Sequence, residues 1–168
     1  EFMLVCAMNP CKCGWYGHPS GKCRCTERDI RHYHSRISGP LLDRIDIIIE
    51  VPALDYEELR RKTPSESSAE MKKRVDKARD IQRKRFKTDG SMCNAAIGSR
   101  ELREFCALSP EGEELMHQAF DSMGLSARSY DRILRVARTI ADLDGCEIIE
   151  PEHIAEAVQY RSYDFREQ

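Results

Sequence analysis

Four of the eight cysteines in this 168-residue sequence gather within fifteen residues, in a pattern suited to binding a metal ion. Cys11 and Cys13 form one Cys-x-Cys pair, and Cys23 and Cys25 form a second pair after nine intervening residues. Structural zinc is held by four thiolates that tight turns bring together, and three glycines between the first and last cysteine favour such turns. We therefore expect a structural zinc site made by these four cysteines, with His18 as a spare ligand. Free thiols in an exposed loop and a disulfide are the alternatives that the spacing leaves open.

The segment around these cysteines is also basic and aromatic. Residues 11–36 contain six Lys and Arg against two Asp and Glu, together with three histidines, Trp15 and Tyr16. Basic surfaces with aromatic side chains bind nucleic acids through phosphates and stacked bases. Residues 60–87 are more basic still, with twelve Lys and Arg against four Asp and Glu. Contact with nucleic acid is one interpretation of both segments, and a solvated charged face is the other.

Three polar residues stand where they could act on a phosphate. Asn9 directly follows an apolar run, and a polar side chain at the end of a strand in an open α/β sheet can orient water or phosphate. Arg44 lies between a short helical turn and a second apolar run, from which it could reach a phosphoryl group on a neighbouring subunit. Its simpler interpretation is a surface ion pair with a neighbouring aspartate, which would be worth little. Arg128 lies in the first turn of a predicted helix, where a cation opposes the helix dipole.

The elements that must position these residues fall into two zones. The apolar runs at residues 2–8 and 45–51 are short and bounded by turn-forming residues, which predicts two buried strands. From about residue 53 onward the pattern predicts helices, of which the one after Ser126 has the broadest apolar stripe. The predicted helix starts are Thr26, Ser67, Ser99, Ser109, Ser126 and Pro151, and the predicted ends include Gly124 and Gly145. Ser67 to Glu70 fits a capping box, and a further short helix is expected at Asp55–Arg61.

The predicted fold class is therefore α+β. Residues 1–52 would be the C-terminal part of an α/β core carrying the cysteine loop, and residues 53–168 an all-α helical lid domain. Two strands cannot make a parallel sheet by themselves, so we expect the chain to be part of a larger protein. With 40% hydrophobic and 33% charged residues, the sequence is not disordered, collagen-like or membrane-spanning. It lacks a signal peptide and any apolar run of about 18 residues, which makes a cytoplasmic location the expectation.

Several of these segments together resemble the magnesium-chelatase-like AAA+ ATPases of the bacterial ComM/YifB competence family. The matching segments are MNPCKCG at 8–14, CRC at 23–25, ISGPLLDRID at 37–46 and LSARSYDRIL at 125–134. They occur in the family's order and the likeness extends over roughly residues 3–160. Lys12 departs from the proline common in the family between the first two cysteines, but both thiolates remain.

The resemblance implies a role for each polar residue. Asn9 would be the first sensor, which positions the attacking water, and Arg44 the arginine finger that acts on ATP bound by the adjacent subunit. Arg128 would be the second-sensor arginine of the lid and would contact the nucleotide. The resemblance further implies ATP and magnesium as cofactors of the intact protein, a homohexameric ring, and single-stranded or branched DNA as partner during branch migration.

One motif of such motors is missing from the sequence. No G-x-x-x-x-G-K-[ST] pattern occurs, so we expect the nucleotide cradle to lie upstream of residue 1. The chain alone is then expected to be inactive as an ATPase, because a finger and sensors need a bound phosphate to act on. A stand-alone zinc-dependent nucleic-acid-binding module is the alternative function, and a purely structural helical interaction domain is a third.

Overall fold

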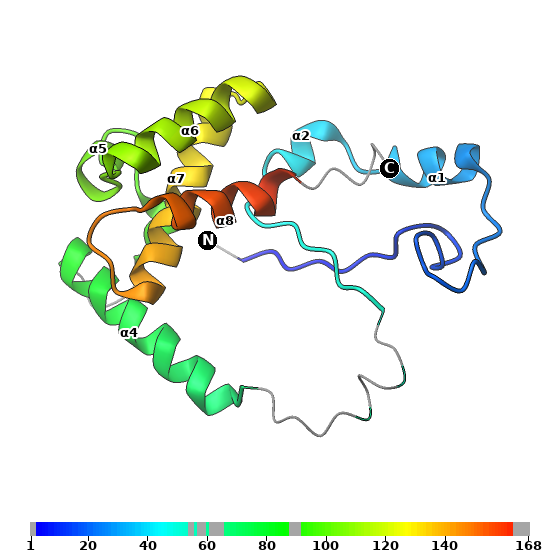
Figure 1. Ribbon diagram of the computed structural model, residues 1–168, viewed down its shortest axis with the longest axis horizontal. Helices are drawn as coiled ribbons and strands as arrows, with labels where there is room; N and C mark the ends of the chain where they lie inside the picture. The colour runs from blue at the N-terminus through cyan, green and yellow to red at the C-terminus, as the bar shows by residue number, and fades with distance from the viewer. Residues whose placement is uncertain (1–2, 54–55, 57–59, 61–65, 88–91, 163–168) are drawn as a thin grey trace.

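The computed structural model describes residues 3–53, 66–87 and 92–162, together with Tyr56 and Arg60. It is elongated, with a helical body made by residues 66–87 and 92–162 at one end and the cysteine loop reaching away from it (Figure 1). Its helices in chain order are α1 Glu27–His34, α2 Gly39–Leu42, α4 Ser68–Phe86, α5 Leu102–Phe105, α6 Pro110–Met123, α7 Ala127–Asp144 and α8 Pro151–Ser162, with the 3-10 helix η1 at Asn94–Ala96. None of these helices combines the length and the apolar character that crossing a bilayer requires.

Most helix ends lie where the sequence predicted them. Ser67 and Glu70 form the expected capping box at the start of α4, and Ser109 and Ser126 accept hydrogen bonds from the first turns of α6 and α7. Gly145 ends α7 in the left-handed conformation, with φ of 77°, which glycine adopts without strain. These ends therefore follow from local backbone hydrogen bonding.

One of the helix predictions needs correction, and another falls mostly outside the described residues. Ser99 does not cap a helix, because α5 begins only at Leu102; the Ser99 hydroxyl donates instead to Asp131 at 2.6 Å. The short helical turn expected before Arg44 is present as α2, with Ser38 as its N-cap. Of the helix expected at Asp55–Arg61, only Tyr56 and Arg60 are described.

The core lies entirely within the helical body. Helix α7 packs against α8, α4, α5 and η1, and α6 packs against α8. The buried members of this core are Ile97, Leu102, Cys106, Met116, Ile133, Leu134, Val136, Ala137, Ile140, Ala141, Ile149, Ile154 and Ala157. Because they all belong to residues 97–157, the helical body holds itself together by burying its own apolar surface.

A buried polar network fastens α4 to α7. Asp142 accepts two hydrogen bonds from Arg85, at 2.5 and 2.7 Å, one from Asn94 at 2.8 Å and one from Arg138 at 3.0 Å. The Asp142 side chain is fully buried and that of Arg138 is 1% exposed. Burial alone would raise the pKa of Asp142, but the hydrogen bonds from Arg85 and Asn94 and the charge of Arg138 lower it below its ordinary value.

The two predicted strands are wrong. The described residues contain no β-sheet, and their single β-type contact is an isolated parallel bridge between Leu108 and Ile149 inside the helical body. Residues 3–8 are extended and exposed, while in residues 45–51 the backbone N–H of Ile48 donates to the end of α8 rather than to a strand. A strand is stable only when it pairs with others, and neither run pairs with another strand within the described ranges. The α/β-core part of the predicted fold class is therefore not seen, whereas a helical lid is compatible with the helical body.

Candidate metal centre and exposed arginines

The four clustered cysteines come together at one point in space. Their sulfur atoms all lie within 4.8 Å of one another, and three of the sulfur–sulfur distances are 3.4, 3.6 and 3.8 Å. A tetrahedral zinc ion bound about 2.3 Å from each sulfur would hold the sulfurs about 3.8 Å apart. A disulfide requires about 2.0 Å, and all eight cysteines are free. The donor set and its spacing therefore fit a four-thiolate metal centre.

Tight turns and one histidine hold this loop together. The backbone N–H of Gly14 donates to the carbonyl of Cys11 at 3.0 Å, and Gly14 has a φ of +80°, a conformation that a residue with a side chain would adopt only with strain. The buried His34 of α1, which follows the loop, donates from Nε2 to the carbonyl of Pro10, which precedes the loop, at 2.8 Å. Helix α1 thereby anchors the segment that enters the cluster.

The electrostatics of the four sulfurs suit a cation. Backbone N–H groups of Arg24 and Trp15 hydrogen-bond to Cys13 and lower its pKa to about 6. The pKa of Cys25 is raised to about 12, first of all because its hydrogen bond with Cys13 favours the protonated thiol. The pKa is thus lowered at two of the sulfurs, Cys11 and Cys13, and raised at the other two, Cys23 and Cys25, which need the charge of a metal ion to lose their protons. His18, the spare ligand of the sequence interpretation, is not part of the cluster; its Nδ1 accepts from the backbone of Ser20 at 3.0 Å.

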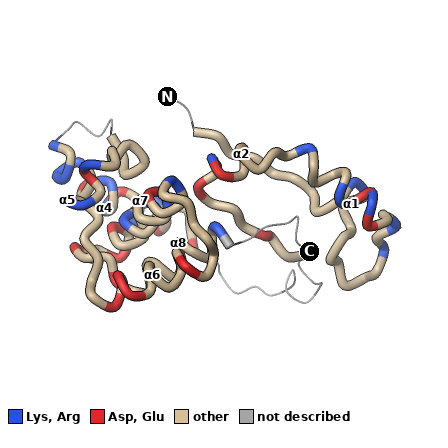
Figure 2. Tube along the Cα trace, turned by 90° about the horizontal axis from the view of Figure 1, so that it is seen from above, with Lys and Arg blue, Asp and Glu red and all other residues tan. Residues whose placement is uncertain are grey.

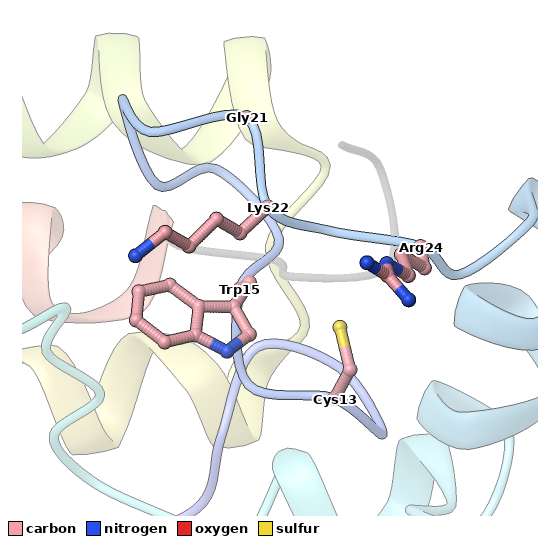
Figure 3. A pocket seen from close by; sticks show the side chains of 5 residues that line it. All are labelled: Cys13, Trp15, Gly21, Lys22 and Arg24. Carbon is pink, nitrogen blue, oxygen red and sulfur yellow. The ribbon is translucent and has the colours of Figure 1, made fainter.

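A hollow opens beside the metal centre (Figure 3). It is lined by Cys13, Trp15, Gly21, Lys22 and Arg24. The ammonium group of Lys22 lies 5.0 Å from the centroid of the Trp15 ring, and Figure 3 shows its side chain extended across that ring. The composition of the loop predicted a basic and aromatic surface, but the sequence did not indicate that the side chains of Lys22 and Trp15 would be in contact.

Two arginines of the helical body bind residues 43–48. From α7, Arg132 donates to the carboxylate of Asp46 at 2.5 Å, and from α8, Arg161 lies 3.5 Å from the carboxylate of Asp43. Each arginine also donates to a backbone carbonyl of the segment, at 2.7 and 2.9 Å. The segment after α2 is therefore fastened to α7 and α8 at several points.

Arg44 stays exposed within this fastened segment. Its guanidinium donates to the carbonyl of Pro40 at 2.7 Å, at the start of the same turn. Both neighbouring aspartates are engaged by other arginines, so the simple ion pair considered from sequence does not form. Within the described part of the chain, Arg44 has no carboxylate partner.

Like Arg44, and unlike the other arginines of α7, Arg128 has no carboxylate partner among the described residues. The later ones each pair with a carboxylate: Arg132 with Asp46, Arg135 with Asp131 and Arg138 with Asp142. Arg128 is exposed, and no acidic side chain among the described residues pairs with it. Residues four apart share a helix face, about 6 Å along the axis, and Arg132 also binds the carbonyl of Arg44. The structure thus brings the segment of Arg44 close to the first turns of α7, which carry Arg128.

Asn9 lies beside the cysteine loop. It is exposed and lies against Gly14, where a Cβ atom would be 3.7 Å from the Asn9 side chain. Among the described residues, no hydrogen bond or ion pair joins it to Arg44 or Arg128.

Basic residues cluster around α1 and the cysteine loop but are interspersed with acidic ones on the helical body (Figure 2). On α4, Lys72 pairs with Asp76 and Arg83 with Asp80, so part of the basic charge predicted there is neutralised within the helix.

Comparison with known proteins covers almost the whole sequence. The family described as "Magnesium chelatase, subunit ChlI C-terminal" matches residues 65–161, and the one described as "Magnesium chelatase, subunit ChlI" matches residues 1–59. The uncharacterized protein YifB of Escherichia coli K12 is 43% identical over 166 residues, and the competence protein ComM of Haemophilus influenzae is 40% identical over 163 residues. These alignments cover 98% and 96% of this chain but 31% of either relative. The chain therefore spans about a third of the length of the relatives it matches.

Proposed function

This chain belongs to the magnesium chelatase ChlI family, in its ComM/YifB-like branch, and we propose that it supplies the arginine finger and lid of an ATP-dependent DNA-remodelling motor. The observation that carries the proposal is the pair of exposed arginines, Arg44 and Arg128, which pair with no carboxylate among the described residues. The later arginines of α7, Arg132, Arg135 and Arg138, are each paired with a carboxylate. A guanidinium held this way is available to a phosphate that comes from outside the chain.

The fastening of residues 43–48 supports a finger role for Arg44. An arginine finger stabilises charge that develops in the transition state, so its position must be fixed before the reaction occurs. Arg132 and Arg161 bind the backbone carbonyls of Arg44 and Ile45 without using the Arg44 side chain. Such a finger typically contributes about 10³–10⁵ in kcat.

The remaining roles complete the proposal. Arg128 would contact the nucleotide as a second sensor, and Asn9 would orient the attacking water as a first sensor. The four cysteines would hold a structural zinc ion, since four thiolates leave no open position for catalysis. ATP and magnesium would be bound by the longer protein, which we propose to be a homohexamer that acts on DNA in the cytoplasm. Residues 1–52 would belong to its ATPase core, and residues 53–168 would form its lid.

Replacing Arg44 in the longer protein tests this proposal. Arg44→Ala is expected to reduce ATP hydrolysis by about 10³-fold or more while leaving ATP binding nearly unchanged, because the finger acts mainly on the transition state. Arg103→Ala, at an exposed arginine of α5, is the matched control and should keep activity. Unchanged hydrolysis, or loss of ATP binding with normal assembly, would exclude the finger role.

A further inference from the structure

The hollow beside the metal centre has the chemistry of a nucleotide-binding surface. Each of its three large side chains stands within two residues of a cysteine of the cluster: Trp15 after Cys13, and Lys22 and Arg24 on either side of Cys23. We propose that this hollow binds single-stranded nucleic acid, with an unpaired base stacked on Trp15 and the adjoining phosphates on Lys22 and Arg24. The inference deepens the proposed function, on which it rests only for DNA as the partner.

Trp15 offers a ring that a base can reach. Its side chain remains 38% exposed, and the edge-on ring of His18 lies against it, with centroids 4.9 Å apart and planes at 79°. This contact braces the indole from one side. The Lys22 side chain, which lies over a face of the indole, is long and flexible, so it can move away when a flat ligand arrives (Figure 3).

A base stacked on Trp15 binds the ring more strongly than the Lys22 ammonium does, so the base can replace the ammonium. A cation over an aromatic ring at an exposed site strengthens an interaction by about 2- to 5-fold, whereas stacking a base on an aromatic side chain is worth about 5- to 150-fold. A base therefore displaces the Lys22 ammonium from the ring. The displaced ammonium then becomes available to the phosphate next to that base.

The combination of two cations and an indole ring favours an unpaired nucleic-acid strand over an acidic protein surface. In the described part of the chain, neither Lys22 nor Arg24 forms an ion pair, whereas the nearby Lys12 lies 4.0 Å from Asp29. An acidic protein would use the two cations but would leave the indole without a matching flat group. A duplex would offer phosphates but keeps its bases stacked inside, so an unpaired strand uses all three side chains.

The metal centre would hold this surface in shape. The three side chains lie on a loop whose ends are joined by the cysteine cluster and its turns, together with the hydrogen bond from His34 to the carbonyl of Pro10. Metal removal should therefore weaken binding even though no nucleic-acid contact is made by the metal itself.

Trp15 is the sole tryptophan of the sequence, so its fluorescence tests the proposal directly in the full 168-residue chain. We expect a thymidine oligonucleotide to quench the emission, and an abasic oligomer of the same length or a duplex to change it little. Binding of a labelled oligonucleotide should weaken about 5- to 150-fold in Trp15→Ala and much less in Trp15→Tyr, which keeps an aromatic ring. Lys22→Gln and Arg24→Gln should each reduce the log–log salt slope by about 0.7.

Arg103→Gln, at an exposed arginine of α5 outside both basic segments, is the matched control with the same loss of charge and should leave affinity and slope unchanged. Metal content is measured for every variant, so that a loop that fails to form is recognised. Unquenched emission at saturating oligonucleotide, equal affinity for the abasic oligomer, or an equal loss in Arg103→Gln would overturn the proposal. Because no nucleotide hydrolysis is involved, this failure would be distinct from failure of the arginine-finger test.

Discussion

Replacing Asp142 by asparagine should destabilise the helical body severely. The substitution keeps the shape of the side chain but removes the only negative charge that faces Arg138 and Arg85 among the described residues; their side chains are 1% and 12% exposed. Removing one partner of a buried ion pair costs about 3–5 kcal/mol, because the remaining charge stays buried without compensation. For a helical body of roughly 100 residues, each kcal/mol lowers the Tm by about 4–8 °C, so the Tm of the helical body should fall by at least about 12 °C.

Urea denaturation followed by far-ultraviolet circular dichroism measures this loss, with an unchanged slope showing that the unfolding transition is the same. Asp131→Asn is the matched control, on the same helix and also opposite an arginine. Its partner Arg135 lies 3.8 Å away, and the two side chains are 20% and 26% exposed, so about 1 kcal/mol or less is expected. Equal losses in the two variants, or a loss below about 1 kcal/mol in Asp142→Asn, would refute the importance given to the buried network.

Three further outcomes follow from the metal centre, the buried carboxylate and a buried thiol. Chain purified under reducing conditions should contain about one zinc ion, which Cys23→Ser should lose and Cys93→Ser should keep; metal-free protein with four reactive thiols in the loop would contradict the site. Because the pKa of Asp142 is lowered in the folded state, its contribution to stability is complete above its ordinary value of 3.8 and is lost as the pH falls through the lower folded value. The unfolding free energy should accordingly drop below about pH 4, and Asp142→Asn should remove this part of the drop when both proteins are titrated in urea. Burial raises the pKa of Cys106 to about 11, so at pH 8 roughly a thousandth of it is thiolate; mass spectrometry after brief alkylation should find the exposed Cys93 labelled and Cys106 unlabelled, and rapid labelling of Cys106 would show that the core opens.

Local signals in the sequence predicted the helical body well. A serine cap such as Ser126 and a left-handed glycine such as Gly145 act through hydrogen bonds to residues a few positions away, so their effect is visible in the sequence itself. The same holds for the cysteine pairs, whose short spacing brings their sulfurs together once the turns form. Ser99 was misassigned because its hydroxyl found a distant partner in Asp131.

Long-range partners could not be predicted in this way. The apolar runs at 2–8 and 45–51 have strand-like composition, but a strand also needs neighbours, which composition does not reveal. Nothing in the local sequence indicates that Arg161 would engage Asp43, more than a hundred residues earlier, and so leave Arg44 without a carboxylate. The availability of Arg44, on which the proposed function depends, therefore emerges only from the structure.

The most direct test is a mixing experiment with two inactive variants of the longer protein. One carries Arg44→Ala with an intact nucleotide cradle, and the other keeps Arg44 but has a disabled cradle. If Arg44 acts on ATP held by the adjacent subunit, an equal mixture should recover hydrolysis at about a quarter of its interfaces, where an intact cradle meets an intact arginine. A mixture that assembles and binds ATP but stays as inactive as its components would contradict the account.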